Sequence, residues 1–324
     1  MNKLDPELDQ RAQPPLLSVV GPTGVGKSAL ALSLAASYRG EIVNADSRQV
    51  YIGMDIGTSK PSLPDRQQVP HHLFDFVDPG TRFNLQWFLA LARTKIWEIH
   101  QRGNLPIVVG GTGQYMHALI EGWETPNVPP QPAYRERLYE LEERNGAGFL
   151  FQWLANTDPV TAKRLSPKNI RRIIRALEIA HFARTPSSTL RKQQPPPYRI
   201  LVLGINTKSR TELYQLIDTR VDGMLDSGWL GEIKHLLELG HTKTNSALAT
   251  MGYRELSDYL DGSLTLEEAT TLVKFAHHRL ARQQLTWFKP SDPQIHWLIS
   301  GENLVVNASD LIQSHFDLTE FRDY

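Results

Sequence analysis

The chain contains no cysteine among its 324 residues. Disulfide bonds, thiolate nucleophiles, cysteine zinc sites and iron–sulfur clusters are therefore excluded. Neither sign of charge is in excess, because 35 Lys and Arg residues balance 35 Asp and Glu residues. This balance argues against a non-specific coat for nucleic acid, although it leaves room for local basic patches.

The sequence also lacks a long apolar run. No stretch approaches the roughly 18 apolar residues of a membrane span, and the first 15 residues are polar and carry prolines, unlike a signal peptide. We therefore expect a soluble cytoplasmic protein without membrane contacts. With 40% hydrophobic residues, the chain can form one large α/β domain with an insertion, or two domains.

What the chain does contain is a complete phosphate-binding loop, GPTGVGKS, at residues 21–28. An apolar run at 16–20 precedes it and a helical pattern at 29–36 follows it. The glycines let backbone N–H groups point inward, and the helix N-terminus adds partial positive charge. In such a loop the lysine neutralises phosphate oxygens and the serine holds Mg²⁺. The residues expected to bind a phosphate chain, with Ser28 as metal ligand, are Gly21, Thr23, Gly24, Val25, Gly26, Lys27 and Ser28.

Short apolar runs separated by helical patterns predict a parallel sheet flanked by helices, with ligand groups at the carboxyl ends of the strands. Strands are predicted at 16–20, 41–45, 105–109 and 198–205. Helices are predicted at 27–38, 84–102 and 114–121, and later at 209–227, 229–239, 247–260, 265–289 and 308–316. The fold class is thus α/β, a P-loop NTPase-like sheet.

Two proline-rich joints interrupt this order. Residues 125–132 carry four prolines and residues 195–197 carry three, and between them lie two helical stretches, 134–145 and 158–184. Such joints are typical of an inserted subdomain. We expect a core made of 1–122 and 198–324 and a helical insertion at 123–197.

Three polar residues are expected at the sheet edge or near it. Asp46 directly follows the second strand and could be a metal ligand, a general base or a helix cap. No other strand ends in an acid, which counts against a nucleotide-hydrolysing motor. Thr112 lies between glycines at a strand end, where a phosphate contact or a simple tight turn both fit. Arg220 could reach the phosphates as an arginine finger does.

Two further groups have open interpretations. His71 and His72 are adjacent and lack a third metal ligand at sensible spacing, so a structural role competes with a catalytic one. Arg171, Arg172 and Arg175 share one broad helix face, with Ile173 and Ile174 facing elsewhere. That face could bind nucleic-acid phosphates or could simply be solvated.

Together these segments resemble the tRNA dimethylallyltransferases of bacterial type, also called isopentenyl-tRNA transferases. The resemblance covers about residues 16–300 and depends most on two specific stretches, DSRQVY from Asp46 and MDIGTSKP from Met54. Further matching segments are PHHLFDFVDP at 70–79, VVGGTGQYMHALIEG at 108–122, RRIIRALEI at 171–179, RVDGMLDSGWLGE at 220–232, MGYRE at 251–255 and QLTWF at 284–288. The sequence departs from many members of that family at Arg282-Gln283, where a Lys-Arg pair is usual.

The resemblance implies a prenyl transfer from dimethylallyl diphosphate to the exocyclic amine of the adenosine 3′ to the anticodon, with Mg²⁺ as cofactor. It implies that Asp46 is the base and that Thr112 and Arg220 meet the leaving diphosphate. It implies a supporting role for His71. The residues implied to contact the tRNA anticodon stem-loop are Asp46, Ser47, Arg48, Gln49, Arg171, Arg172, Ile173, Ile174, Arg175, Gly252, Tyr253 and Arg254.

Other functions stay possible on the sequence. An adenylate isopentenyltransferase would act on free AMP, ADP or ATP with the same chemistry, but it would not need the inserted basic helices. A small-molecule kinase is opposed by the missing second acid and by the DSRQVY segment. A non-enzymatic nucleotide-binding module is opposed by the intact polar set. We expect a monomer without an obligate protein partner.

Overall fold

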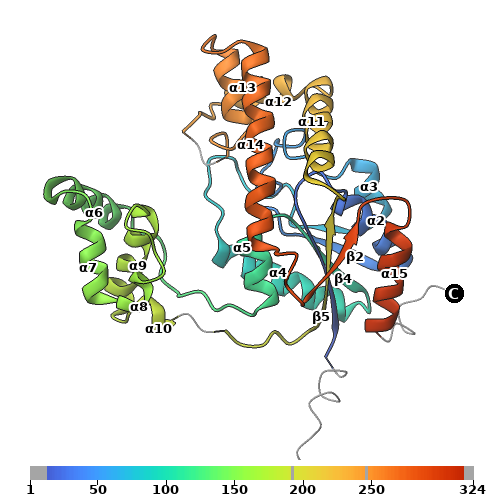
Figure 1. Ribbon diagram of the computed structural model, residues 1–324, viewed down its shortest axis with the longest axis horizontal. Coiled ribbons are helices and arrows are strands. Elements are labelled where there is room, and N and C mark those ends of the chain that lie inside the picture. The colour runs from blue at the N-terminus through green and yellow to red at the C-terminus, as the bar shows by residue number, and fades with distance from the viewer. Residues whose placement is uncertain (1–12, 191–192, 245–246, 317–324) are drawn as a thin grey trace, which may run out of the picture. The chain divides into compact units, whose positions relative to one another are not determined.

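The computed structural model describes residues 13–190, 193–244 and 247–316. The chain divides into two compact units, shown in Figure 1. The core unit comprises residues 1–120 and 197–324, and the insert comprises residues 121–196. These boundaries differ from those expected from the prolines by two residues at the first joint and by one at the second.

The core unit is built on a six-stranded parallel sheet in the order β3-β2-β4-β1-β5-β6. Its strands are β1 (Pro15–Val20), β2 (Gly40–Asn44), β3 (His71–His72), β4 (Leu105–Val109), β5 (Arg199–Asn206) and β6 (Ile295–Ile299). The four predicted strands are confirmed. The two edge strands were not predicted, since β3 has only two polar residues and β6 is half exposed.

Helices cover both faces of this sheet, as Figure 1 shows. On one face, α2 (Lys27–Ser37) and α15 (Leu304–His315) bury Leu34 and Ile312 against sheet residues such as Ile107. On the other lie α4 (Leu85–Gln101) and α5 (Gly113–Ile120), whose apolar sides are fully buried at Phe88 and Met116. The sheet interior is therefore dry, and its carboxyl edge is left for the polar loops.

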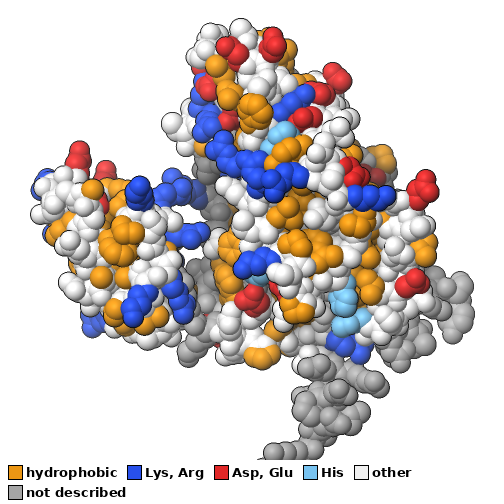
Figure 2. Space-filling model, viewed as in Figure 1, with side chains coloured by type: hydrophobic (Ala, Val, Ile, Leu, Met, Phe, Trp, Pro, Cys, Tyr) orange, Lys and Arg blue, Asp and Glu red, His pale blue; other side chains and the backbone are white. Residues whose placement is uncertain are grey.

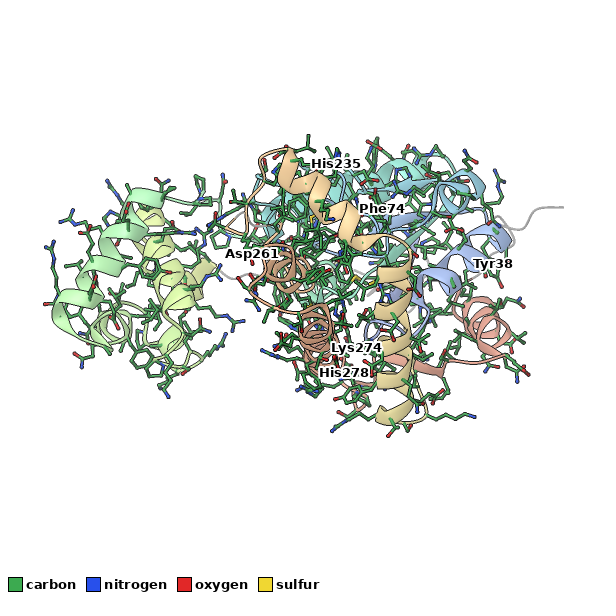
Figure 3. All side chains as sticks on the ribbon, turned by 90° about the horizontal axis from the view of Figure 1, so that it is seen from above. Tyr38, Phe74, His235, Asp261, Lys274 and His278 are labelled. Atoms are coloured by element: carbon green, nitrogen blue, oxygen red, sulfur yellow. The ribbon has the colours of Figure 1, made fainter. Side chains whose placement is uncertain are left out.

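A helical layer with its own hydrophobic cluster completes the core unit. It contains α11 (Arg210–Asp226), α12 (Trp229–Glu238), α13 (Tyr253–Leu260) and α14 (Leu266–Trp287), while the short α3 (Leu63–Gln68) precedes β3. Lys274 and His278, labelled in Figure 3, join α14 to α11 through Asp222 and Asp218, at 2.7 and 2.8 Å. The Lys274 ion pair and the His278 contact hold together the two helices that flank the phosphate loop.

The helix predicted at 247–260 begins only at Tyr253. Gly252 has φ +84°, and a Cβ there would lie 2.2 Å from the ring of Trp229. Only glycine fits at position 252, because the buried Trp229 ring fills the space that a side chain would need and the backbone has a positive φ. The residues just before it form turns and not helix.

The insert is all helical and has a separate core, which includes Leu138, Leu154 and Leu177. Its helices are α6 (Pro132–Asn145), α7 (Phe149–Thr157), α8 (Pro159–Ala162), α9 (Ile170–Ala183) and α10 (Ser187–Leu190). The single helix predicted at 158–184 is wrong, because Pro167 interrupts it and the Asn169 side chain caps a new helix. The helix α7 was not predicted.

The two chain segments that enter and leave the insert lie side by side. The Gln194 amide donates to the Gly122 carbonyl at 3.0 Å, and Trp123 and Gln193 form an antiparallel bridge. None of the helices in the described part of the chain has the length and apolar character needed to cross a bilayer.

Candidate active site

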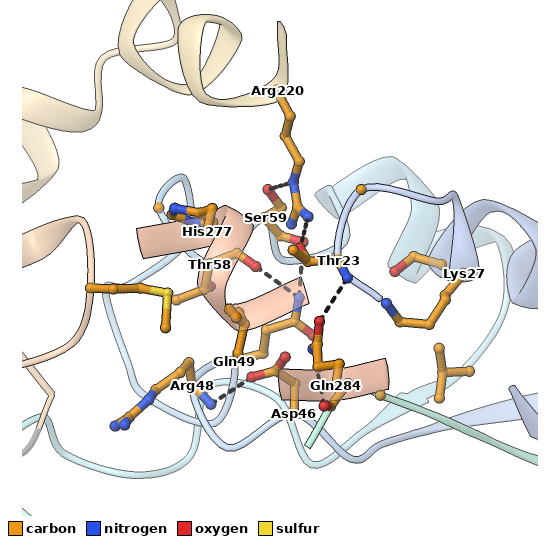
Figure 4. A pocket seen from close by; sticks show the side chains of 18 of the residues that line it. Thr23, Lys27, Asp46, Arg48, Gln49, Thr58, Ser59, Arg220, His277 and Gln284 are labelled. Carbon is orange, nitrogen blue, oxygen red and sulfur yellow. Dashed lines mark hydrogen bonds between the residues drawn. The ribbon is translucent and has the colours of Figure 1, made fainter. Parts of the chain in front are cut away.

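A cavity of about 340 Å³ opens at the carboxyl edge of the sheet in the core unit. Figure 4 shows that its walls come from segments far apart in the sequence: the phosphate loop, the segment after β2, the loop after β4, and the helices α11 and α14. Parallel strands deliver their following loops to one edge, so this is where the topology places a ligand site.

The phosphate loop forms one wall as predicted. Gly26 has φ +90° and precedes α2, which starts at Lys27. Of the predicted loop residues, those that line the cavity are Thr23, Gly24, Gly26, Lys27 and Ser28. Gly21 and Val25 do not, and the Val25 side chain packs in the hydrophobic core with 1% exposure.

Three cations line this cavity, namely Lys27, Arg48 and Arg220, and the first and last of them are close to one another. Lys27 donates from Nζ to the Pro22 carbonyl at 2.7 Å. Arg220 donates from Nε to the Ser59 hydroxyl at 3.0 Å and from Nη1 to the Thr23 hydroxyl. Burial and the nearby Arg220 lower the pKa of Lys27 to about 7, and the Asp46 carboxylate only partly opposes them. An anionic ligand between them would relieve this repulsion.

Asp46 faces the same cavity. Its backbone N–H donates to the Asn44 side chain at 2.8 Å, and one carboxylate oxygen accepts the Arg48 N–H at 2.8 Å. Figure 4 shows the other oxygen directed into the cavity. Asp46 caps no helix in the structure; instead, its backbone is held rigidly while one oxygen stays available for a ligand.

The neighbours of Asp46 differ in what they face. Arg48 and Gln49 line the cavity, whereas Ser47 and Thr112 do not and bind one another. The Ser47 N–H donates to the Thr112 hydroxyl at 3.0 Å. Gln49 donates to the carbonyls of Thr58 and Ser59, both at 3.0 Å. The loop that carries Ser59 therefore positions both Gln49 and Arg220.

Gln284 of α14 was not predicted as a site residue, although it begins the QLTWF segment. Its side chain is 5% exposed and bridges two loops. It accepts the Thr23 N–H at 2.8 Å and donates to the Gly111 carbonyl at 3.0 Å. The amide thereby fixes the phosphate loop relative to the loop that follows β4.

Gly252 and Tyr253, two of the residues predicted to contact tRNA, are both buried in the core unit. Tyr253 is fully buried and its hydroxyl donates to Glu232 at 2.6 Å, while Gly252 packs on Trp229. Arg254 alone of the three is exposed, and it pairs with Glu255 at 2.6 Å. Tyr253 supports the site from behind, because Glu232 also accepts the N–H groups of Asp55, Ile56 and Gly57.

The predicted tRNA-binding segment of the insert separates into exposed and internal residues. Arg171 and Arg172 are exposed on α9. Arg175 is half buried and pairs with the fully buried Glu178 at 2.5 Å. Ile173 and Ile174, also predicted as contact residues, are 0% and 2% exposed, so their side chains lie in the core of the insert and not at its surface. Figure 2 shows Lys and Arg side chains on the surface of the insert and over the upper helices of the core unit.

His71 lies on β3 and does not line the cavity. Its Nδ1 contacts the Val69 carbonyl at 2.8 Å, its ring packs edge-on against Phe74, and burial lowers its pKa. The Asn44 side chain binds the Leu73 carbonyl at 2.9 Å and the Asp46 carbonyl at 3.1 Å. Asn44 therefore links this segment to Asp46.

The oxygens of Ser28 and Asp46 line the cavity and suit a hard cation. Among the described residues, no cluster of three His, Asp or Glu side chains could hold a metal on its own. Mg²⁺ usually keeps waters and takes one or two protein oxygens together with substrate phosphates, and the Ser28 hydroxyl in the phosphate loop suits this use.

The fold and the site define an enzyme of the P-loop class that binds a phosphate chain beside one carboxylate. The sequence profile of the IPP transferase family matches residues 49–291, and the chain belongs to this family. This membership confirms the resemblance inferred from the motifs.

Similar proteins agree with this assignment. A tRNA dimethylallyltransferase of Dehalococcoides mccartyi is 42% identical over 93% of this chain and 92% of its own, and one of Roseiflexus sp. is 46% identical over 94% and 99%. The tRNA isopentenylpyrophosphate transferase structure from Bacillus halodurans has a TM-score of 0.69 at 36% identity, covering 93% of this chain and 96% of its own. A eukaryotic dimethylallyltransferase acting on tRNA has a TM-score of 0.80 at 28% identity, covering 93% and 78%. The predicted fold class is confirmed.

Proposed function

We propose that this enzyme transfers a dimethylallyl group from dimethylallyl diphosphate to the N6 amine of the adenosine 3′ to the anticodon in tRNA. The observation that supports this most is the composition of the cavity. The half-buried Lys27 and Arg220 line it together with one carboxylate, Asp46. The relatives carry the name tRNA dimethylallyltransferase, which favours tRNA over free AMP as acceptor.

The residues divide the reaction between them. The adenine amine is a weak nucleophile, so Asp46 takes its proton as the new C–N bond forms. The allylic C–O bond breaks, and its electron pair leaves with the diphosphate. Lys27, Arg220 and the N–H groups of the phosphate loop meet that charge. No water has to be activated, and a single carboxylate is therefore sufficient.

Ser28 would hold Mg²⁺ together with diphosphate oxygens. When bound, the ion would neutralise part of the charge that develops on the leaving group. Thr112 acts in this proposal through Ser47, since its hydroxyl lies behind the cavity wall. His71 would act indirectly, through the β2–β3 backbone and Asn44, because it does not line the cavity.

For the RNA, we propose contacts from the segment Asp46–Gln49 to the target base. The exposed cations Arg171, Arg172 and Arg254 would meet phosphates. The target base has to leave its stack to reach Asp46, as in other enzymes that modify bases.

The test is an incubation of the protein with Mg²⁺, labelled dimethylallyl diphosphate and either an unmodified anticodon stem-loop or AMP. Label in the stem-loop that is lost when the target adenosine is replaced by guanosine is the expected result. Label only in AMP would identify the enzyme as an adenylate isopentenyltransferase that acts on free nucleotides. No label in either acceptor would refute prenyl transfer to adenine.

A further inference from the structure

A group of five aromatic rings lies next to the active site in the core unit, and the proposed chemistry does not use it. It consists of Phe76, Phe83, Trp87, Phe88 and Tyr115, here named the aromatic ridge. Phe83 contacts three of the others, with ring centroids 5.5 Å from Phe76, 5.1 Å from Trp87 and 6.1 Å from Tyr115. Phe88 stacks on Tyr115 at 4.4 Å and an angle of 11°.

The ridge has a buried base and an exposed crest. Phe88 and Tyr115 are 1% and 5% exposed, while Trp87 and Phe76 are 39% and 36% exposed. The Asn84 side chain accepts the Trp87 N–H at 3.0 Å and so fixes the start of α4. The rings beneath them thus hold two large rings at the surface. Exposure of apolar rings does not stabilise the fold, so a role in binding is expected.

Backbone hydrogen bonds connect the ridge to the segment that carries Asp46. The N–H groups of Phe76 and Val77 donate to the Val50 carbonyl, both at 3.0 Å, and the Ile52 N–H donates to Val77 at 2.9 Å. The Tyr115 N–H donates to the Thr112 carbonyl at 2.9 Å. Burial raises the pKa of the Tyr115 hydroxyl, and Asp46 and Arg48 lie close enough for their charges to act on it as well. The backbone of the crest is therefore bonded to the same segment that supplies Asp46, Arg48 and Gln49 to the cavity.

We propose that the crest formed by Trp87 and Phe76 is a stacking surface for an unpaired nucleobase that neighbours the target adenosine. This inference rests on the proposed function, because it takes the acceptor to be an RNA loop. Bases in single-stranded loops bind by stacking on aromatic side chains, and basic residues hold the adjacent phosphates. Arg48 at the cavity and the exposed Arg82 beside Phe83 supply that positive charge.

The test compares Trp87→Ala with Trp97→Ala, which removes another exposed tryptophan from the same helix α4. Binding of an unmodified anticodon stem-loop is measured without donor. A stacked base is worth at least about fivefold in affinity, so Kd should rise by that factor or more for Trp87→Ala and stay unchanged for Trp97→Ala. The KM for dimethylallyl diphosphate should not change in either variant.

The same measurement with abasic nucleotides identifies the stacked base. At one position flanking the target adenosine, removal of the base should weaken binding to the wild type. The affinities of that abasic RNA for the wild type and for Trp87→Ala should then be equal. Equal stem-loop affinity of wild type and Trp87→Ala would overturn the inference and leave the crest to a protein partner. An undiminished Trp87→Ala effect on every abasic RNA would also overturn it. Failure of the wild type to modify the stem-loop would instead refute the proposed function.

Discussion

At the scale of single residues, the cavity combines charges that destabilise one another until a ligand arrives. Lys27 and Arg220 are both desolvated, and Asp46 only partly compensates for them. A diphosphate would restore the charge balance of the cavity. The phosphate loop alone thus does not determine affinity, because Arg220 from α11 contributes to the electrostatics of Lys27.

The low pKa of Lys27 predicts that donor binding depends on pH. The amine is protonated below about pH 7 and loses its proton above it. Between pH 7.5 and 8.5, where the donor is fully ionised, Kd for dimethylallyl diphosphate should rise by up to about tenfold. Calorimetry in two buffers should show uptake of a proton on binding. Lys27→Met should bind weakly with a flat profile, and a flat wild-type profile would contradict the prediction.

Asp46→Asn keeps the shape of the side chain and the acceptor for the Arg48 N–H but removes the base. We expect kcat to fall by about 10²- to 10⁴-fold, because general-base catalysis contributes on that order. The Kd for dimethylallyl diphosphate should change little. Single-turnover rates with stem-loop RNA measure the effect, and an unimpaired rate would exclude Asp46 as the base.

The residues that the sequence predicted well are those set by short spacing. The phosphate loop and Asp46 follow directly from strands β1 and β2, so their positions could be derived from local patterns. Arg220 was predicted near the phosphates and does line the cavity, whereas Gln284 was missed. Their bonds to Thr23, from 197 and 261 residues away, could not be derived from a local pattern. Likewise, the burial of Tyr253 and Ile173 depends on packing, which motif matching ignores.

At the scale of elements, one carboxylate on α12 organises the loop between residues 55 and 59. Glu232 accepts the N–H groups of Asp55 and Ile56, both at 2.7 Å, that of Gly57 at 3.2 Å, and the Tyr253 hydroxyl at 2.6 Å. The next two residues of this loop hold Gln49 and Arg220. The helix α12 thereby positions groups on two sides of the cavity without touching a ligand.

Glu232→Gln should therefore destabilise the fold and weaken the site together. An amide supplies one acceptor oxygen and turns a donor toward backbone N–H groups, so the free energy of unfolding should fall by about 2–3 kcal/mol. Urea denaturation measures this loss, and the KM for donor should rise. Tyr253→Phe, the matched control, removes only one hydrogen bond and should cost about 1 kcal/mol with an unchanged tRNA KM. A large rise in tRNA KM for Tyr253→Phe would instead indicate a direct contact between the Tyr253 hydroxyl and tRNA.

Element predictions were sound in the sheet interior and poorer at its edges and in the insert. Strands β1, β2, β4 and β5 each contain a short apolar run and are buried almost throughout, which is typical of the interior of a parallel sheet. The edge strand β6 is partly exposed and carries a mixed pattern, so it could not be recognised. The break before α9 could have been inferred from Pro167 and Asn169.

At the scale of the whole molecule, RNA binding should depend on charges that do not hold the fold together. Arg171 and Arg172 are exposed on α9, whereas Arg175 binds the buried Glu178 and the Val128 carbonyl. The double change Arg171→Ala and Arg172→Ala should raise tRNA KM and reduce the slope of log K against log salt by up to about 2. Filter binding at several salt concentrations measures the slope.

The control for this experiment is Arg175→Ala, which leaves Glu178 short of one of its two arginine partners in the core of the insert. It should lower thermal stability more than it changes the salt slope. An unchanged slope in the double variant would assign the exposed arginines to a solvated surface.

The paired segments at Gly122 and Gln194 have a consequence for how this enzyme can diverge. The chain enters and leaves the insert at one hydrogen-bonded point. In terms of chain entropy, the whole insert is therefore equivalent to one closed loop attached to the core unit. The entropy of closing such a loop grows only with the logarithm of its length. The insert can therefore be lengthened, shortened or exchanged during evolution while the catalytic framework keeps almost the same stability.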